Sequence, residues 1–412
     1  MQITPDLSRL LNELETLASF SDAPAPAVTR VVFSAQDLAA RTYLRKLFSE
    51  AALEVRTDAV GNTFARWVGA DPALPPVATG SHTDAVPHAG RYDGTVGVLG
   101  GLEAIRALQR SGFRPRRSIE LLVFTSEEPT RFGIGCLGSR MLSGTLSPES
   151  ARQLRNGDGK SLEEILRQAG FDGSLENVRL AKDYYHAFVE LHIEQGPLLE
   201  LKGIPVGIVT AIAAPAALRV TIEGAGGHAG AVLMPDRRDA FLAAAEIALA
   251  VESAAKGTRS GDSVATTGVC KVFPGAVNSI PSRVVLEIDV RDIDLARRDG
   301  MLSAIRAACE TVAAKRQVRA EVELINADAP AQASPLITKA LSASCRTLGI
   351  EFMPMVSRAY HDSLFLSRIA PAGMLFIPCR NGVSHRPDEY AAPEDIKRGV
   401  QVLAVALAQL AE

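Results

Sequence analysis

Residues 80–94, GSHTDAVPHAGRYDG, follow the apolar run LPPVATG and concentrate histidines and aspartates at one point of the chain. A histidine directly after a strand lies at the edge where α/β sheets bind ligands, which favours a binding role for His82. Asp84 is two residues further on and could accept the proton of the second imidazole nitrogen, as partners of metal-binding histidines do. Asp93 precedes the helical pattern GTVGVLGG. The alternative is that Asp93 caps this helix and that His82 is a loop residue whose hydrogen bonds are satisfied locally.

A pair of adjacent carboxylates ends a second apolar strand, in FTSEEPTRFG at 124–133. Two neighbouring carboxylates repel each other, and a nearby cation removes the conflict. Side chains of successive strand residues diverge, so one of Glu127 and Glu128 can bind a metal while the other acts as a base. The alternative is an exposed pair with Arg131 as its partner.

Two more histidines follow strand patterns, His192 in ELHIEQG and His385 in GVSHRPDEY. A lone histidine in an apolar strand is more often a core residue. The prediction of a metal site therefore depends on these histidines taken together with the carboxylates. With His82, Asp93 and one glutamate, these residues supply nitrogen and carboxylate ligands that suit zinc or manganese. Five ligands are too many for one tetrahedral site. An aspartate that bridges two ions accounts for the number.

The segment GIGCLG at 133–138 fits a dinucleotide-binding pattern, but PTRF separates it from the preceding strand. That spacing argues against a nucleotide site and predicts that the glycines let the loop pack beneath the glutamate pair. The chain has no GxSxG, P-loop lysine or HExxH motif. Farther along, His228 lies in a glycine-rich turn. Arg291 ends a strand, where it could bind a substrate carboxylate or form a surface ion pair with a neighbouring aspartate.

The predicted elements position these residues in two domains. Strands and helices alternate up to about residue 210, which predicts an α/β domain with a mixed, mainly parallel sheet. The order then becomes βαββαβ, which predicts a smaller α+β domain inserted into the larger one. We therefore expect a discontinuous catalytic domain over 1–210 and 328–412, with the insertion over 211–327.

Composition limits the possible partners. The 412-residue chain has a formal net charge of −3 and five scattered cysteines, which argues against a nucleic-acid partner and a disulfide framework. The first twenty residues predict an amphipathic helix and not a signal peptide. No apolar run reaches the ~20 residues that span a bilayer, so we expect a cytoplasmic protein with no membrane partner.

From about residue 25 onward, the motifs GSHTDAVPHAGRYDG, TSEEPTRFG, ELHIEQG, GGHAGAVLMPDRRDA and SHRPDEY resemble the dinuclear-metal amidohydrolases related to the M20 peptidases. That group includes allantoate amidohydrolase, N-carbamoyl-L-amino-acid hydrolase, β-ureidopropionase and ureidoglycolate amidohydrolase. The segment SRAYHDSLF is most similar to the ureidoglycolate enzymes, because the other relatives usually carry Gly-His-Asp where this chain has Tyr360-His361-Asp362. The order VLMPD, where many relatives have Thr-Pro-Met, also matches the ureidoglycolate form.

The resemblance implies a zinc-peptidase-like catalytic domain, an insertion that dimerises, and two divalent metal ions, Mn²⁺ or Zn²⁺. His82 and His192 would bind one ion, Glu128 and His385 the other, and Asp93 would bridge them. Glu127 would be the general base, and His228 would reach the active site of the partner subunit. The residues implied to hold substrate are Gln195, Asn278, Arg291, Tyr360 and His361.

The implied reaction is hydrolysis of the ureido C–N bond of (S)-ureidoglycolate to glyoxylate, ammonia and carbon dioxide, as in purine and allantoin breakdown. Allantoate and N-carbamoyl-L-amino acids remain alternative substrates, because the metals, base and arginine are shared. An alternative from another class is a non-catalytic, metal-containing binding protein. An intact Glu127 argues against it.

Overall fold

The computed structural model describes residues 3–412, and the chain divides into two compact units. The first unit comprises Met1–Thr210, Gln332–Ser357 and His361–Glu412, and the second comprises Ala211–Ala331 with Arg358–Tyr360. The insertion predicted over 211–327 falls within the second unit, which also takes in residues 328–331 and 358–360. In that unit the Tyr360 hydroxyl contacts the Asp328 carboxylate, and Arg358 pairs with Asp262 at 2.8 Å.

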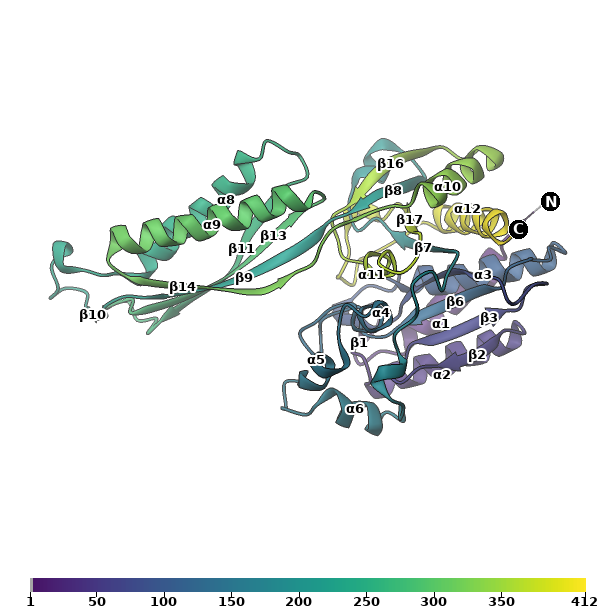
Figure 1. Cartoon of the computed structure of the whole chain (residues 1–412), viewed down its shortest axis with the longest axis horizontal. Coiled ribbons are helices and arrows are strands. Elements are labelled where there is room, and N and C mark those ends of the chain that lie inside the picture. Colours follow the sequence, from purple (N-terminus) through teal and green to yellow (C-terminus); the bar gives the residue numbers. More distant parts are fainter. Residues whose placement is uncertain (1–2) are drawn as a thin grey trace. The chain divides into compact units, whose positions relative to one another are not determined.

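A nine-stranded sheet forms the centre of the first unit (Figure 1). Its strands run in the order β15-β8-β17-β7-β4-β6-β3-β2, and β16 pairs with β8. The bounds are β2 (Glu54–Thr57), β3 (Thr63–Trp67), β4 (Val77–His82), β6 (Ile119–Phe124), β7 (Ala187–Ile193), β8 (Val206–Ile212), β15 (Ala331–Gln332), β16 (Phe352–Ser357) and β17 (Ala372–Ile377). A separate two-stranded sheet pairs β1 (Val28–Arg30) with β5 (Ala85–Ala89).

The α/β class and the mixed sheet predicted from the sequence are confirmed, with parallel pairing among the four central strands. β17 pairs with β7, β7 with β4, and β4 with β6, all in parallel. The flanking pairs β17–β8, β6–β3 and β3–β2 are antiparallel. Because the four central strands point the same way, their carboxyl ends meet at one edge, where α/β sheets bind ligands.

Helices cover this sheet, and two buried apolar clusters lie on its faces. One cluster contains Leu99 and Leu102 of α3 with Leu403 and Leu407 of α12, and the other contains Leu137 of α4. The bounds are α1 (Leu7–Ser19), α2 (Ala35–Glu50), α3 (Thr95–Arg110), α4 (Leu137–Ser143), α5 (Pro148–Gln153), α6 (Leu162–Gln168), α7 (Leu198–Lys202), α10 (Pro335–Leu348), α11 (Asp362–Leu366) and α12 (Pro393–Ala411). No helix in the described part of the chain is long and apolar enough to cross a membrane.

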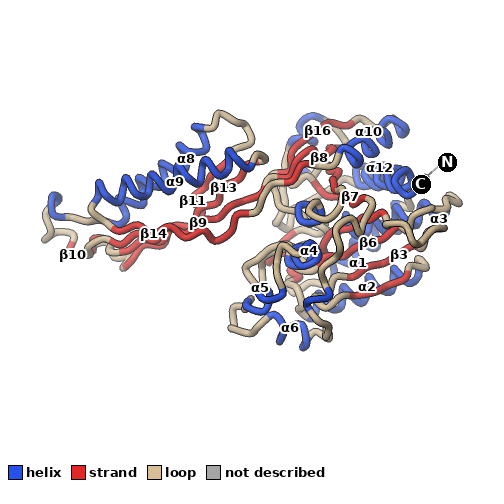
Figure 2. Tube along the Cα trace, in the orientation of Figure 1, coloured by secondary structure: helices blue, strands red, loops and turns tan. Residues whose placement is uncertain are grey.

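The second unit is a four-stranded antiparallel sheet in the order β11-β13-β9-β14, with α8 and α9 along one face (Figure 2). Alternate residues of β9 and β13 are buried against these helices. The order of the main elements is the predicted βαββαβ. The bounds are β9 (Ala214–Glu223), β10 (Gly227–His228), α8 (Ala240–Gly257), β11 (Val264–Phe273), β12 (Ser279–Ile280), β13 (Arg283–Asp292), α9 (Leu295–Arg316) and β14 (Arg319–Ala327).

Candidate metal centre

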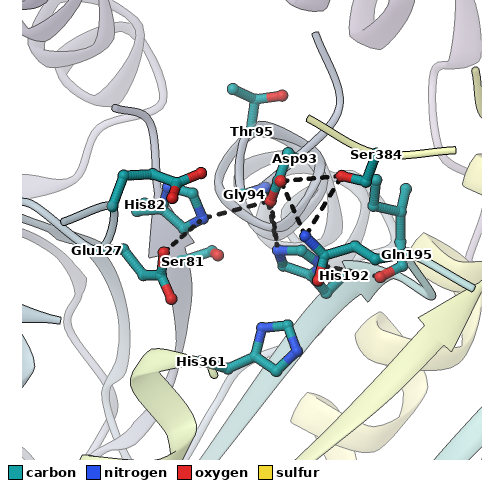
Figure 3. Close-up of polar contacts among 12 residues, drawn as sticks. Ser81, His82, Asp93, Gly94, Thr95, Glu127, His192, Gln195, His361 and Ser384 are labelled. Carbon is teal, nitrogen blue, oxygen red and sulfur yellow. Dashed lines mark hydrogen bonds and ion pairs between the residues drawn. The ribbon is translucent and has the colours of Figure 1, made fainter. Parts of the chain in front are cut away.

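The site is built around the buried carboxylate of Asp93, in the loop between β5 and α3 (Figure 3). Its Oδ1 lies 3.1 Å from Nε2 of His192 and 3.5 Å from Nε2 of His82. Its Oδ2 lies 3.0 Å from Nε2 of His385. His82 is the last residue of β4 and His192 the last but one of β7, so neighbouring parallel strands deliver both rings. The structure thus brings all three predicted histidines to the two oxygens of one aspartate.

Backbone carbonyls fix the orientation of the two buried imidazoles. Nδ1 of His82 lies 3.0 Å from the carbonyl oxygen of Asp84, and Nδ1 of His192 lies 2.9 Å from that of Ile193. A carbonyl oxygen can only accept, so both Nδ1 atoms carry the proton. Each Nε2 lone pair then faces the carboxylate of Asp93. Two acceptors in contact repel, so this arrangement calls for a second proton on each ring or a metal ion.

A second group of candidate metal ligands, His385 and Glu128, lies on the side of Oδ2 of Asp93. Nε2 of His385 lies 3.2 Å from Oε1 of Glu128, in addition to its contact with Asp93. The His385 side chain is 48% exposed, whereas Glu128 is buried, so this half of the site is the more open to solvent. Asp93 therefore faces two separate groups of ligands through its two oxygens.

Asp84 holds the glutamate pair through the backbone. Its Oδ1 accepts from the N–H of Glu127 at 3.2 Å, and its Oδ2 accepts from the N–H of Glu128 at 3.0 Å. The sequence analysis assigned this carboxylate to the His82 imidazole, but it lies 3.7 Å from Nδ1 of that ring, while the Asp84 carbonyl is closer. The assignment of the partner residue agrees with the structure. The accepting atom differs, because the carboxylate is occupied by two amide groups.

Burial and charge give the two central carboxylates opposite protonation preferences. Burial favours the neutral form of Asp93, but hydrogen bonds with His192, His385 and His82 outweigh it and hold the pKa of Asp93 well below its usual range. Burial raises the pKa of Glu127 well above its usual range, against the attraction of His82. Glu127 lies with Oε2 3.8 Å from Nε2 of His82. An acid with a raised pKa beside an anionic ligand group is the distribution that general acid–base chemistry uses.

Two residues expected to hold substrate also lie at this centre. Nε2 of Gln195 donates to Oδ2 of Asp93 at 2.9 Å, and its Oε1 is buried without a hydrogen-bond partner. The ring of His361 lies 4.6 Å from that of His192, and its Nε2 lies 3.0 Å from the Ser357 hydroxyl. Burial and the neighbouring His192 lower the pKa of His361 well below its usual value, so the imidazole is neutral.

The remaining predicted residues belong to the second unit and form two groups within it. His228 lies in β10, and the N–H of Ala229 donates to the carbonyl of Asn278 at 2.8 Å. Arg291 lies near the end of β13, where it donates to Asp289 at 2.7 Å and to the carbonyl of Arg358 at 2.9 Å. Its predicted alternative, an ion pair with a neighbouring aspartate, is therefore present. Tyr360 lies in the segment that contains Arg358.

Two residues of the site were missed by sequence reasoning, although both stand in the motif of His385. Oε1 of Glu389 accepts from the N–H groups of Tyr92 and Asp93 at 2.8 and 3.1 Å, and its Oε2 accepts from Ser384 at 2.8 Å. Ser384 also lies 3.1 Å from Oδ2 of Asp93. Glu389 therefore joins the loop of His385 to the backbone of Asp93. In the sequence, the only indication of a role for Glu389 is its position four residues after His385.

The donor set fits divalent metal ions. Ligand atoms of His82, Asp93 and His192 lie within 4.8 Å of one another, and so do those of Asp93, Glu128 and His385. Imidazole nitrogen and carboxylate oxygen suit zinc and manganese. The Nε2 atoms of His82 and His192 both face the carboxylate of Asp93, an arrangement that a bound cation would stabilise.

Comparison with known proteins confirms the resemblance expected from the motifs. Residues 78–409 match Peptidase family M20/M25/M40, and the chain belongs to this family, whose members are metal-dependent. The chain is 53% identical over 417 residues to the ureidoglycolate hydrolase of Arabidopsis thaliana, covering 99% of this chain and 87% of that protein. It is 40% identical over 405 residues to an N-carbamoyl-L-amino acid amidohydrolase of Geobacillus stearothermophilus, covering 98% of each. The crystal structure of AtUAH in complex with glyoxylate superposes with a TM-score of 0.89 at 53% identity, covering 99% of this chain and 98% of that one.

The close approach of the loop to His82 gives a first prediction. Gly94 has a φ of 64°, and a Cβ at this position would lie 2.5 Å from the His82 ring. Gly112 has a similar φ of 77° but open space around it. Alanine at either position carries left-handed backbone strain of roughly 1–2 kcal/mol, and only Gly94→Ala also displaces the imidazole. Urea unfolding should therefore show a larger loss of stability for Gly94→Ala than for Gly112→Ala. Equal losses would contradict the clash.

Proposed function

We propose that this protein is a metal-dependent amidohydrolase that cleaves the ureido C–N bond of (S)-ureidoglycolate. The observation that carries the proposal is the Asp93 centre, where two ligand groups share one carboxylate and a buried glutamate lies 3.8 Å from His82. The similarity to ureidoglycolate hydrolase at 53% identity supports this substrate over the N-carbamoyl amino acids of the 40% relative.

Glu127 is the group placed to move protons. It would take the proton of the attacking water and return it to the nitrogen that leaves, which is the role of a single carboxyl that alternates between base and acid. His82 and His192 would hold one divalent ion, Glu128 and His385 the second, and Asp93 would serve both. Such ions would acidify the water and polarise the ureido carbonyl. His228 would donate to the oxygen on which negative charge develops.

The products of the proposed hydrolysis account for every atom of ureidoglycolate and water, and two of them match ligands found in structures of AtUAH. Water adds to the ureido carbonyl, the C–N bond breaks, and the carbamate half yields carbon dioxide and ammonia. The other half is hydroxyglycine, which loses a second ammonia to give glyoxylate. Structures of AtUAH have been solved in complex with (S)-hydroxyglycine and with glyoxylate, which supports this order of products here. Gln195, whose Oε1 is unpartnered, and the neutral His361 would bind the substrate together with Asn278, Arg291 and Tyr360.

The distribution of these residues in the second unit supports a homodimer as part of the proposal. His228 pairs with Ser279 just before β13 begins, whereas Arg291 lies near the other end of that strand. Eight residue steps separate Arg283 from Arg291, which is ~27 Å of extended chain. One small substrate cannot contact both ends of the same sheet. We therefore assign His228 and Arg291 to different substrate sites, with His228 acting in the site of the partner subunit, as the resemblance implies.

Manganese and zinc both suit the ligands, and the share of carboxylate tilts the choice toward manganese. The cytoplasmic location expected from the sequence stays a prediction. The described cysteines are free, which fits a reducing compartment.

Metal binding gives the second prediction. The protein loaded with manganese should hold about two ions per chain, and His385→Ala should reduce the ratio to about one, because only one ligand group loses a member. Asp93→Asn should weaken both positions. Elemental analysis after dialysis measures each ratio. Retention of both ions by His385→Ala would contradict the division of ligands.

The dimer gives the third prediction, which co-expression of two inactive variants tests. In a dimer of Glu127→Gln with His228→Ala, one of two sites combines an intact Glu127 with an intact His228 from the other chain. Random pairing makes half of the dimers mixed, so activity should recover to about a quarter of wild type. Glu127→Gln co-expressed with Asp93→Asn is the matched control, and it should recover nothing. Absence of recovery in the first pair would place His228 in its own chain's site.

The substrate gives the fourth prediction. The manganese-loaded protein should hydrolyse (S)-ureidoglycolate with a kcat/KM about 100-fold or more above those for allantoate and N-carbamoyl-L-amino acids. Glu127→Gln should lose roughly 100- to 10,000-fold in kcat, as expected for a lost acid–base group. Equal rates for the three substrates would overturn the substrate, and no turnover at all would favour a metal-containing binding protein.

A further inference from the structure

One cysteine lies directly against the proposed base. Cys136 is fully buried, and its Sγ lies 3.4 Å from Oε1 of Glu127. The residue stands in the GIGCLG segment, for which the sequence analysis predicted only that glycines let the loop pack beneath the glutamate pair. That packing is present, since a Cβ at Gly135 would lie 2.8 Å from the Glu127 carbonyl oxygen.

The backbone holds Cys136 at this place. Its N–H donates to the Glu127 carbonyl at 2.8 Å, and the next N–H, that of Leu137, donates to Ser126 at 2.9 Å. Cys136 has φ 56° and ψ 36°, a left-handed conformation that costs a non-glycine residue energy and persists only where the surroundings impose it. Glycine would adopt this backbone conformation without strain, so the Cys136 side chain occupies this position at a local energetic cost.

The thiol acts as a hydrogen-bond donor. Burial and the carboxylates of Glu127 and Asp362 raise the pKa of the Cys136 thiol well above its usual value. A protonated thiol can donate to a carboxylate and is a poor nucleophile. The geometry directs its S–H at Oε1 of Glu127.

The contact distinguishes the two oxygens of Glu127. Oε1 faces the thiol. Oε2 lies 3.8 Å from Nε2 of His82, and Figure 3 shows this second contact. We propose that Cys136 is a positioning residue, whose S–H binds one oxygen of Glu127 and so keeps the other directed at the centre formed by His82, Asp93 and His192. The inference rests on the proposed function, because it explains the orientation of Glu127, the base that the proposed reaction requires.

Three substitutions distinguish the hydrogen bond that the Cys136 thiol donates from the packing of its side chain. Cys136→Ala removes the donor, Cys136→Ser supplies a hydroxyl donor in nearly the same volume, and Cys136→Gly removes the donor while relieving the left-handed strain. Cys345→Ala is the matched control, since Cys345 is equally buried but lies in α10. The metal content and the unfolding midpoint of each variant are measured first. Cys136→Gly serves as the donor-free variant if Cys136→Ala does not fold.

We expect kcat to fall about 5- to 10-fold for Cys136→Ala and Cys136→Gly at unchanged KM and metal content, because each loses one hydrogen bond from a weak S–H donor. Cys136→Ser should stay within about 2-fold of wild type. Wild-type kcat in the two donor-free variants, or a loss in Cys136→Ser equal to theirs, would overturn the proposal.

A crystal structure of Cys136→Ala gives a readout that needs no substrate. The Glu127 carboxylate should turn away from the centre or become disordered, whereas the wild-type and Cys136→Ser crystals keep it in place. If the wild type hydrolyses no ureido acid, the proposed function fails. The position of Glu127 in these crystals still decides whether Cys136 sets it, and an unmoved Glu127 would overturn that role.

Discussion

The structure of the site depends on the charge of one buried carboxylate. Asp93 is held anionic by three imidazoles that come from β4, β7 and the loop after β17. A buried charge is tolerated only where partners compensate it, so these segments must converge wherever Asp93 lies. The two imidazoles bound to backbone carbonyls direct Nε2 at it. Divalent cations would fit between these groups, so one aspartate could organise two groups of ligands.

The groups proposed to do the chemistry are held mainly through backbone amides. Asp84 binds the N–H groups of Glu127 and Glu128, and Glu389 binds those of Tyr92 and Asp93. Each carboxylate accepts two consecutive amides, which fixes a short segment of chain and leaves the side chains free for ligands or protons. Such support preorganises the charges before substrate arrives. Burial raises the pKa of Glu127, and the hydrogen bonds of three imidazoles outweigh burial and lower the pKa of Asp93.

Strand ends explain what the sequence could predict. His82, His192 and the glutamate pair follow apolar runs, and parallel strands bring such residues together whatever the details of packing. The α/β class and the order βαββαβ follow from the same periodicities. Contacts between loops could not be predicted from the sequence. The atom of Asp84 that meets His82, the link from Glu389 to Asp93, and the thiol of Cys136 beside Glu127 depend on how loops fold onto one another. The separation of Asn278 from Arg291 was readable, because Arg291 lies near the far end of the ten-residue strand that begins at Arg283.

Asp93 is proposed to serve two cation positions through its two oxygens. Anomalous diffraction from manganese-soaked crystals tests it most directly, because the scattering locates each ion independently of any assay. The account predicts two peaks, one among Oδ1 of Asp93, His82 and His192, and one among Oδ2 of Asp93, Glu128 and His385. A single peak, or two peaks of which either lies away from Asp93, would contradict it.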